Sequence, residues 1–164
     1  MKPVRAVGVQ YAALPYRIAG RRLEVLLLTS RGTGRWVIPK GWPMQGKSPQ
    51  EAAAIEAHEE AGVEGDIAAA SIGSYRYLKR LKSDRRVPVQ VLVFPLEVTA
   101  EVERWKEQTE RSRRWVSYAV ASRLVSERGL KRLIREWGRS RTPGLLGSAS
   151  RLFTLLKQFR ARSR

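Results

Sequence analysis

The stretch GWPMQGKSPQEAAAIEAHEEAGV, from Gly41 to Val63, decides how the rest of the chain folds. It opens with a turn rich in glycine and proline, and the alanine-rich run that follows has a high helix propensity. Ser48 stands three residues before Glu51, which is the spacing of a capping box, and Pro49 takes the favoured first helical position. Gly62 is expected to end the helix as its C-terminal cap.

The predicted helix carries three glutamates close together. Glu56 and Glu60 are four residues apart and Glu56 and Glu59 are three apart, so their side chains are expected to share one helix face. Crowded carboxylates repel one another, and a hard divalent cation such as Mg²⁺, which binds carboxylates together with substrate phosphates, would relieve that repulsion. The alternative is a solvated acidic helix face, which is the usual place of a charged run.

The stretch resembles the Nudix box, G-x5-E-x7-R-E-U-x-E-E-x-G-U, in which U is an aliphatic residue. The residues in register with this pattern are Gly41, Glu56, Ala57, Glu59, Glu60, Gly62 and Val63. Two positions differ, since Lys47 stands where the first glutamate belongs and Ile55 stands where the arginine belongs. That arginine helps to hold the acidic groups of the box in the family, so we expect the two departures to be linked. The resemblance implies an α/β fold, a Nudix-type αβα sandwich around a mixed β-sheet.

The resemblance also implies a reaction and a set of site residues. The reaction is the divalent-metal-dependent hydrolysis of a pyrophosphate bond in a highly phosphorylated small molecule, such as a dinucleoside polyphosphate, a nucleoside diphosphate derivative or an inositol pyrophosphate. Glu56, Glu59 and Glu60 would be the catalytic residues and, with the Gly41 carbonyl, the ligands of Mg²⁺, or alternatively of Mn²⁺. Either Glu59 or Glu60 would accept a proton from the attacking water, and the sequence does not choose between them.

Three further segments, at 2–6, 30–39 and 111–115, look like the Nudix branch that hydrolyses diphosphoinositol polyphosphates and diadenosine polyphosphates. In that branch a basic residue on the first strand and a Ser-Arg pair before the tryptophan strand contact substrate phosphates. The resemblance implies this role for Arg5, Ser30 and Arg31, and Lys40 is a local addition whose charge suits a phosphate. The segment PKGWPM at 39–44 replaces a glycine-rich segment of the branch, so the identity of the substrate stays open.

Several side chains near this site have open roles. Trp42 would either stack on a nucleobase or fill a gap in the core. Glu103, Glu107 or Glu110 would supply a further metal ligand or a base, but their spacing does not choose among them. His58 is the one histidine of the chain, and it is not favoured as a base because its helix position points away from the glutamate face.

The chain is strongly basic, with 32 Lys and Arg against 15 Asp and Glu and a formal net charge of +17. Such a charge attracts polyanions, namely nucleic acid, an anionic membrane or a polyphosphorylated small molecule, and the alternative is a merely soluble basic surface. No apolar run approaches the roughly 20 residues of a membrane span. Without cysteine there is neither a disulfide framework nor a thiolate metal site. The start of the chain lacks the apolar region of a secretory signal, and we expect a cytoplasmic protein.

Hydrophobic patterning predicts the elements outside the box helix. Strands are expected at 5–13, 23–29, 36–38, 67–79, 87–98 and 115–116, and helices at 118–125 and 130–137. Turns are expected at 20–22, 64–65 and 82–86, and an irregular segment at 101–113. Pro88 and Pro95 indicate a local edge or bulge in the strand at 87–98.

We expect a Nudix hydrolase domain at 1–138 and a basic C-terminal linker and amphipathic helix at 139–164. The second segment has no Asp or Glu, and its apolar residues suit one helix face: Leu152, Phe153, Leu155, Leu156 and Phe159. Such a helix would bind RNA or an anionic membrane surface, or pack on its own domain or on a second copy in a homodimer.

The alternative to an enzyme is a Nudix-fold module that binds RNA or another polyanion with weak or no catalysis. The altered positions Lys47 and Ile55 favour this alternative, and the intact glutamate triplet opposes it.

Overall fold

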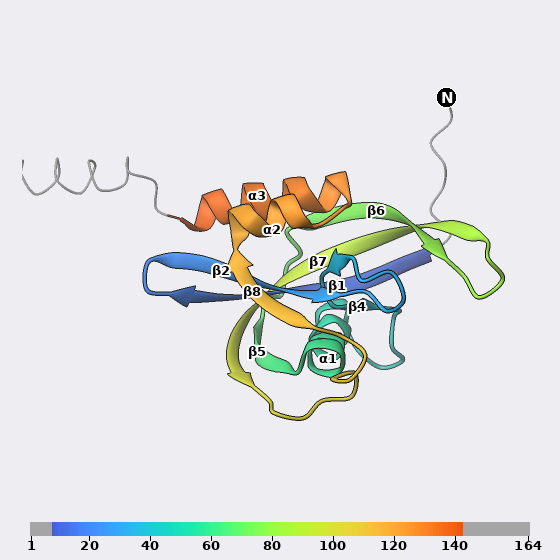
Figure 1. Ribbon diagram of the computed structural model, residues 1–164, viewed down its shortest axis with the longest axis horizontal. Helices are drawn as coiled ribbons and strands as arrows, with labels where there is room; N and C mark the ends of the chain where they lie inside the picture. The colour runs from blue at the N-terminus through green and yellow to red at the C-terminus, as the bar shows by residue number, and fades with distance from the viewer. Residues whose placement is uncertain (1–7, 143–164) are drawn as a thin grey trace, which may run out of the picture.

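Two long strands, β1 and β7, form the centre of the sheet in the computed structural model, which describes residues 8–142 (Figure 1). The strands are β1 Gly8–Ala19, β2 Arg22–Thr29, β3 Trp36–Val37, β4 Lys40–Gly41, β5 Val63–Ile67, β6 Gly73–Arg80, β7 Arg86–Glu101 and β8 Arg113–Ser117. The helices are α1 Pro49–Ala61, α2 Tyr118–Leu124 and α3 Arg128–Arg141.

The sheet is mixed, as the sequence predicts. β1 and β7 pair in parallel from Gly8↔Val89 to Tyr16↔Glu97, and every other pairing is antiparallel. β2 and β4 pair with β1, β3 and β8 pair with β2, and β5 and β6 pair with β7. Helix α1 covers one face of the sheet and α2 and α3 cover the other (Figure 1), so the predicted αβα sandwich is confirmed.

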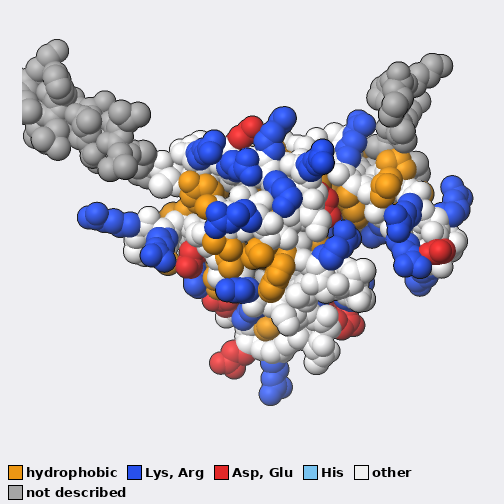
Figure 2. All heavy atoms as spheres, turned by 45° about the horizontal axis from the view of Figure 1, so that its top comes forward, with side chains coloured by type: hydrophobic (Ala, Val, Ile, Leu, Met, Phe, Trp, Pro, Cys, Tyr) orange, Lys and Arg blue, Asp and Glu red, His pale blue; other side chains and the backbone are white. Residues whose placement is uncertain are grey.

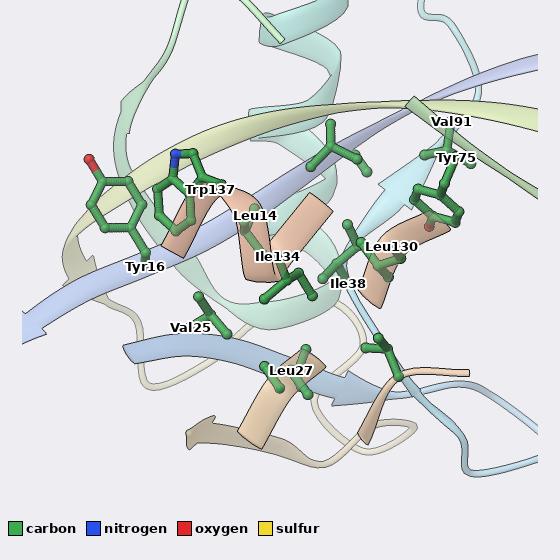
Figure 3. Close-up of a cluster of buried hydrophobic side chains, with 14 of the residues drawn as sticks. Leu14, Tyr16, Val25, Leu27, Ile38, Tyr75, Val91, Leu130, Ile134 and Trp137 are labelled. Atoms are coloured by element: carbon green, nitrogen blue, oxygen red, sulfur yellow. The ribbon is translucent and has the colours of Figure 1, made fainter. Parts of the chain in front are cut away.

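Both faces of the sheet are buried, which explains the run of three leucines in β2. Leu26 and Leu28 pack with the alanines of α1, whereas Leu27 packs on the opposite face with α2 and α3. Successive side chains of a strand point to opposite faces, so three consecutive fully buried leucines require cover on both sides. Figure 3 shows the cluster that contains Leu27 and the residues of α3. In it the Trp137 ring meets the Tyr16 ring edge-on, with the ring centroids 4.9 Å apart.

Pro95 of β7 lies in the interior of the sheet, yet it sits where the partner strand on one side of β7 changes. Pro88 lies opposite Leu78 of β6. Pro95 lies between the last pair with β6, Gly73↔Val93, and the first pair with β5, Ile67↔Leu96. The missing N–H of Pro95 is therefore tolerated at this local gap.

The prediction for 64–79 was wrong in two places. The expected turn at 64–65 lies inside β5, where a bulge falls between Glu64 and Gly65. A Cβ on Gly65 would lie 1.8 Å from the Glu97 carbonyl oxygen, so glycine allows this close approach of two backbones. The expected single strand at 67–79 begins only at Gly73, because the chain leaves β7 after β5 and returns to the same strand as β6.

The box helix has the predicted ends. The Ser48 hydroxyl accepts a hydrogen bond from the Glu51 N–H, and the Glu51 carboxylate accepts one from the Ser48 N–H at 2.7 Å. Gly62 adopts the left-handed conformation with φ 64° and donates to the carbonyl groups of Ala57 and His58. The capping box and the glycine cap are therefore confirmed.

The structure describes only the first four residues, 139–142, of the predicted C-terminal segment at 139–164. Helix α3 continues through Arg141, beyond the predicted end at 137, and residues 143–164 lie outside the described part of the chain. The boundary after 138 and the amphipathic helix stay predictions. Within residues 8–142, no helix is long and apolar enough to cross a membrane.

Replacing Ser48 with alanine should lower the free energy of unfolding by about 1 kcal/mol, because it removes the hydroxyl that caps α1. Urea denaturation followed by circular dichroism measures the change. Ser71→Ala is the matched control, since Ser71 is exposed and lies outside any helix. Equal stabilities of the two variants would contradict a structural role for the cap.

Candidate functional site

A cleft of about 1240 Å³ opens beside the box helix. Its wall is formed by the loop at 30–35, β4 and the turn after it, one side of α1, the β6–β7 hairpin and the β7–β8 loop. These segments are far apart in the sequence, and the sheet brings them together because β4 pairs with β1 while β6 pairs with β7. Both acidic and basic side chains line this cleft, together with apolar residues such as Trp42 and Met44.

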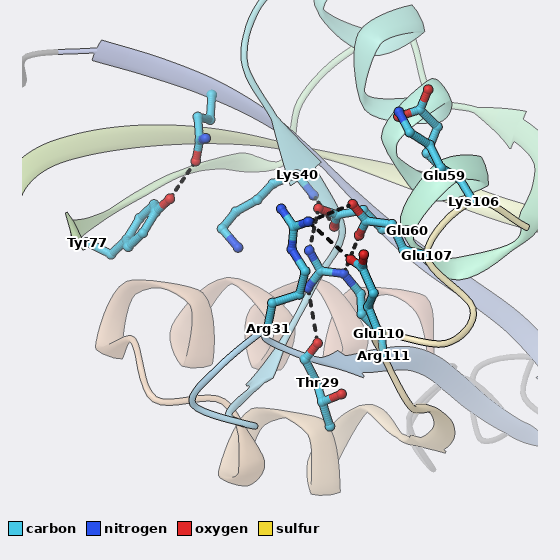
Figure 4. A network of polar contacts seen from close by, with 11 residues as sticks. Thr29, Arg31, Lys40, Glu59, Glu60, Tyr77, Lys106, Glu107, Glu110 and Arg111 are labelled. Atoms are coloured by element: carbon cyan, nitrogen blue, oxygen red, sulfur yellow. Dashed lines mark hydrogen bonds and ion pairs between the residues drawn. The ribbon is translucent and has the colours of Figure 1, made fainter. Parts of the chain in front are cut away.

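Glu60 is the most tightly held of the acidic side chains. Its side chain is 11% exposed, and its carboxylate accepts hydrogen bonds from the Lys40 backbone N–H at 3.2 Å and from the Arg111 guanidinium at 2.9 Å. Burial raises the pKa of Glu60, while Arg111 and Lys40 act in the opposite direction. Both carboxylate oxygens therefore have a fixed direction relative to β4 (Figure 4).

Glu56 lies against Gly41, and this contact explains the glycine. A Cβ on Gly41 would lie 1.9 Å from the Glu56 Oε1 atom, so any side chain there would displace the carboxylate. Burial and the neighbouring carboxylates of Glu60, Glu59 and Glu107 raise the pKa of Glu56 to about 7. Glu56 and Glu60 thus share the cleft, as their spacing predicts.

Glu59 is turned away from this cleft. Its carboxylate accepts a hydrogen bond from Lys106 at 2.9 Å, apart from the cluster around Glu60 (Figure 4). Glu59 lines a shallow groove together with His58, whose Nδ1 atom lies 3.1 Å from Glu64. The structure therefore brings two of the three box glutamates together, and the role of Glu59 as a metal ligand stays a prediction.

Three of the predicted substrate-binding residues line the cleft. Arg31 is 60% exposed and pairs with Glu110 at 3.1 Å. Ser30 lies at the same wall, but its hydroxyl already bonds to Thr33 at 2.6 Å and accepts the Arg35 N–H at 3.0 Å. Burial lowers the pKa of Lys40.

The remaining predicted residues have mixed outcomes. Arg5 lies outside the described residues. Trp42 is 44% exposed and lines the cleft, so it does not fill a gap in the core. Of the three glutamates in the β7–β8 loop region, Glu107 lines the cleft, while Glu110 pairs with the exposed Arg31 and Glu103 is absent from the lining.

Sequence reasoning missed the basic side chains that the β6–β7 hairpin adds to the cleft. The β6–β7 hairpin, expected only as a polar turn, contributes Lys79, Arg80, Lys82 and Arg86 to the cleft. The signal was present as five basic residues among the eight positions 79–86. Only the pairing of β6 with β7 shows that this hairpin reaches the same cleft as the box helix.

Sequence reasoning also missed Arg111. Its side chain is 8% exposed and forms ion pairs with Glu60 and Glu107 and a hydrogen bond of 3.0 Å to the Thr29 carbonyl. Arg111 is separated from Glu60 by 51 positions, so no local spacing links the two.

Residues 9–137 match the family model of the NUDIX domain. The chain belongs to the Nudix family. Nudix hydrolase 12 of Arabidopsis thaliana, a mitochondrial protein, is 31% identical over 119 residues, which cover 71% of this chain and 59% of that protein. Diphosphoinositol polyphosphate phosphohydrolase 3-alpha of Mus musculus is 34% identical over 108 residues, covering 64% of this chain and 62% of that one. The chain thus spans less than two thirds of the length of these relatives.

Solved structures share the Nudix fold at lower identity. A Caenorhabditis elegans Ap4A hydrolase in a binary complex has a TM-score of 0.61 at 21% identity, covering 81% of this chain and 96% of that one. The NUDIX domain of NrtR from Shewanella oneidensis, complexed with ADP ribose, has a TM-score of 0.59 at 15% identity. The match covers 80% of this chain and 88% of that one.

The donor set of the Nudix cleft suits a hard cation, although the ligand shell is incomplete. Within residues 8–142, no three Asp, Glu, His or Cys side chains form a group that could hold a metal by themselves. Glu56 and Glu60 nevertheless present carboxylate oxygens to one cleft. Mg²⁺ typically takes one or two carboxylates and completes its shell with substrate phosphates and water, so two glutamates are sufficient.

The raised pKa of Glu56 predicts a pH dependence of stability in the metal-free protein. A carboxyl whose folded-state pKa is about 7 binds its proton more tightly in the folded than in the unfolded state. Stability should therefore fall as the pH rises from about 4.5 to 7, and Glu56→Gln should remove this loss.

Thermal melts of wild type and Glu56→Gln between pH 4.5 and 8, with EDTA present, measure the effect. The melting temperature of the variant relative to wild type should increase across this window. Glu103→Gln is the control, because Glu103 is exposed and absent from the cleft lining. A difference between Glu56→Gln and wild type that does not change with pH would contradict the burial of this carboxyl.

Proposed function

We propose that this Nudix protein hydrolyses a pyrophosphate bond in a highly phosphorylated small molecule, with Mg²⁺ or Mn²⁺ as cofactor. The observation that carries the proposal is one cleft that is lined by Glu56 and Glu60 and by eight lysines and arginines. Carboxylates suit the metal, and a cationic wall suits the phosphates that the metal does not neutralise. Family membership supports the same class of reaction.

Glu56 and Glu60 are the residues that would hold the metal. When bound, the ion supplies charge neutralisation at the phosphate and acidifies a water molecule. The Lys40 N–H and the Arg111 guanidinium orient Glu60, and Gly41 leaves room for Glu56, so the chain fixes both carboxylates in advance. Glu60, which lines the cleft, is the candidate to accept the proton of the water, whereas Glu59 would have to turn away from Lys106 to do so.

The number of basic residues in the cleft points to a substrate with several phosphates. Those that line it are Arg31, Arg35, Lys40, Lys79, Arg80, Lys82, Arg86 and Arg111. Diphosphoinositol polyphosphates and Ap4A, the substrates named for similar proteins, and ADP ribose, the ligand complexed with the NrtR domain, all carry adjoining phosphates. We propose that the substrate belongs to this group, as a dinucleoside polyphosphate, a nucleoside diphosphate derivative or an inositol pyrophosphate.

The test is a panel of Ap4A, ADP ribose, nucleoside triphosphates and an inositol pyrophosphate, assayed with Mg²⁺, with Mn²⁺ and with EDTA. At least one compound should be hydrolysed only with metal. Glu60→Gln should lower kcat on it by on the order of 100-fold or more, because several kcal/mol of charge stabilisation depend on the metal ligands.

Glu103→Gln is the matched control, since it removes one exposed carboxylate outside the cleft and should keep wild-type turnover. The proposal fails if the wild type hydrolyses nothing in the panel, or if Glu60→Gln retains wild-type kcat at saturating Mg²⁺ while folded.

A second candidate function, binding of RNA, is favoured by the outer side of α3. Figure 2 shows Lys and Arg side chains spread over the face of the molecule that carries α2 and α3. Four arginines recur at helical spacing along the side of α3 that is opposite its buried residues: Arg128, Arg132, Arg135 and Arg139. Within residues 8–142, Arg132 alone of the four has an acidic partner, Glu136 at 3.4 Å.

This arginine row suits a phosphate backbone better than a membrane. A helix that binds a membrane surface inserts apolar side chains, whereas the large exposed hydrophobic residues within 8–142 are Val9, Ile18, Trp42 and Leu78, none of them on α3. A row of cations spaced by one helical turn, about 5 Å, can neutralise successive phosphates of a single strand.

Fluorescence anisotropy with a labelled 20-nucleotide RNA tests the second candidate. Changing the four arginines to glutamine should weaken binding at least tenfold and make its salt dependence shallower. The control changes Arg21, Arg22, Arg104 and Arg114 to glutamine, which removes the same charge from other exposed positions. Equal losses in both variants would mean that only net charge matters, and tight binding to phosphatidylserine vesicles but not to RNA would reject the RNA assignment.

A further inference from the structure

The box of this Nudix protein lacks the arginine that the resemblance leads one to expect at position 55. Ile55 lines the shallow groove with His58 and Glu59, and it does not line the cleft that holds Glu56 and Glu60. Lys47, at the other altered position, is exposed. The box itself therefore offers no cation to hold Glu60.

A cation reaches Glu60 from outside the box. Arg111 lies in the loop between β7 and β8, and its Nη2 atom is 2.9 Å from Glu60 Oε1. Its Nε atom pairs with Glu107 and its Nη1 atom donates to the Thr29 carbonyl at 3.0 Å. One guanidinium thus links the box helix, the end of β2 and its own loop (Figure 4).

We propose that Arg111 is a positioning residue that takes over the work of the missing box arginine and holds the Glu60 carboxylate in place. The catalytic part of this inference rests on the proposed hydrolysis, whereas the structural part does not. The side chains of Arg111, Glu60 and Glu107 are 8%, 11% and 14% exposed. Two carboxylates at this depth need a buried cation, since an unpaired buried charge is strongly destabilising.

Arginine is required by the geometry. A planar guanidinium presents several donors in a fixed fork, so it can contact Glu60, Glu107 and a carbonyl at once. A lysine ammonium at the same place is a point charge on a flexible stem and would hold one carboxylate without fixing its direction. Charge alone therefore does not replace Arg111.

The same loop contributes a second, weaker cation. Lys106 donates to Glu59 at 2.9 Å but is 67% exposed, so water screens this pair and it contributes little. The backbone N–H of Glu107 also donates to the Glu59 carbonyl at 3.1 Å, which ties the loop to the end of α1. The β7–β8 loop thus contacts both Glu59 and Glu60. Its contact with Glu60, made by Arg111, is the buried one.

A double-mutant cycle in the metal-free full-length protein tests the structural part. Arg111→Met should lower the melting temperature by about 6 to 15 °C, because the buried carboxylates of Glu60 and Glu107 lose their shortest ion pairs. Adding Glu60→Gln should recover at least half of that loss, since it removes one of the unpaired charges. Arg132→Met, which removes an arginine from an exposed pair with Glu136, should change the melting temperature by less than about 2 °C.

Each outcome of the double-mutant cycle either supports or overturns the role proposed for Arg111. Recovery by Glu60→Gln, or rescue of folding if Arg111→Met cannot be purified folded, supports the proposal. Strictly additive effects of the two changes overturn it, and so does a melting temperature of Arg111→Met equal to wild type. The same cycle with Arg111→Lys, which keeps the charge, should show a smaller loss and a smaller recovery.

Kinetics distinguish positioning from a substrate contact. If Arg111 positions Glu60, Arg111→Met should lower kcat by about 10- to 100-fold and raise the Mg²⁺ concentration for half-maximal rate, with KM changed less than threefold. A raised KM with unchanged kcat would overturn positioning in favour of phosphate binding. If no substrate is hydrolysed by the wild type, the proposed function fails, yet the stability cycle still decides whether Arg111 holds Glu60.

Discussion

The parallel pairing of β1 with β7 is the constraint on which the rest of the structure depends. β2 and β4 pair with β1, and β5 and β6 pair with β7, so among the strands of residues 8–142 only this pair joins the two halves of the sheet. The chain must pass from β4 on one side to β5 on the other, and α1 makes that passage across one face of the sheet. The box helix consequently lies over the junction of the two halves, where segments from both can surround its glutamates.

This arrangement also explains the electrostatics of the cleft. Carboxylates of α1 and of the β7–β8 loop are partly or wholly removed from water, and burial raises the pKa of Glu56 and of Glu60. Cations from the other half of the sheet and from the loop lie around them, with Arg111 in direct contact and Lys40 through its backbone N–H. A cleft that is lined by both carboxylates and many basic side chains is suited to a metal with a polyphosphate.

Local signals were sufficient for the box helix and for most strands. The capping box, the first-turn proline and the glycine cap act within a few residues, so the limits of α1 follow from the sequence and agree with the structure. The resemblance to the Nudix box then predicted the αβα sandwich around a mixed sheet. The segment 64–79 was misread because the bulge at Gly65 and the gap before Gly73 arise from contacts with residues of β7 that lie twenty or more positions later.

The sequence by itself therefore determined the family, the box helix and the spacing that unites Glu56 with Glu60, because these depend on helical periodicity and on short-range hydrogen bonds. Only the tertiary structure decided that Glu59 turns to Lys106, that Glu107 lines the cleft and that Arg111 holds Glu60. It also decided that the hairpin at 79–86 forms a cationic wall. The physical reason is that these contacts join segments separated by twenty to more than fifty residues, and only the pairing of β1 with β7 brings those segments together.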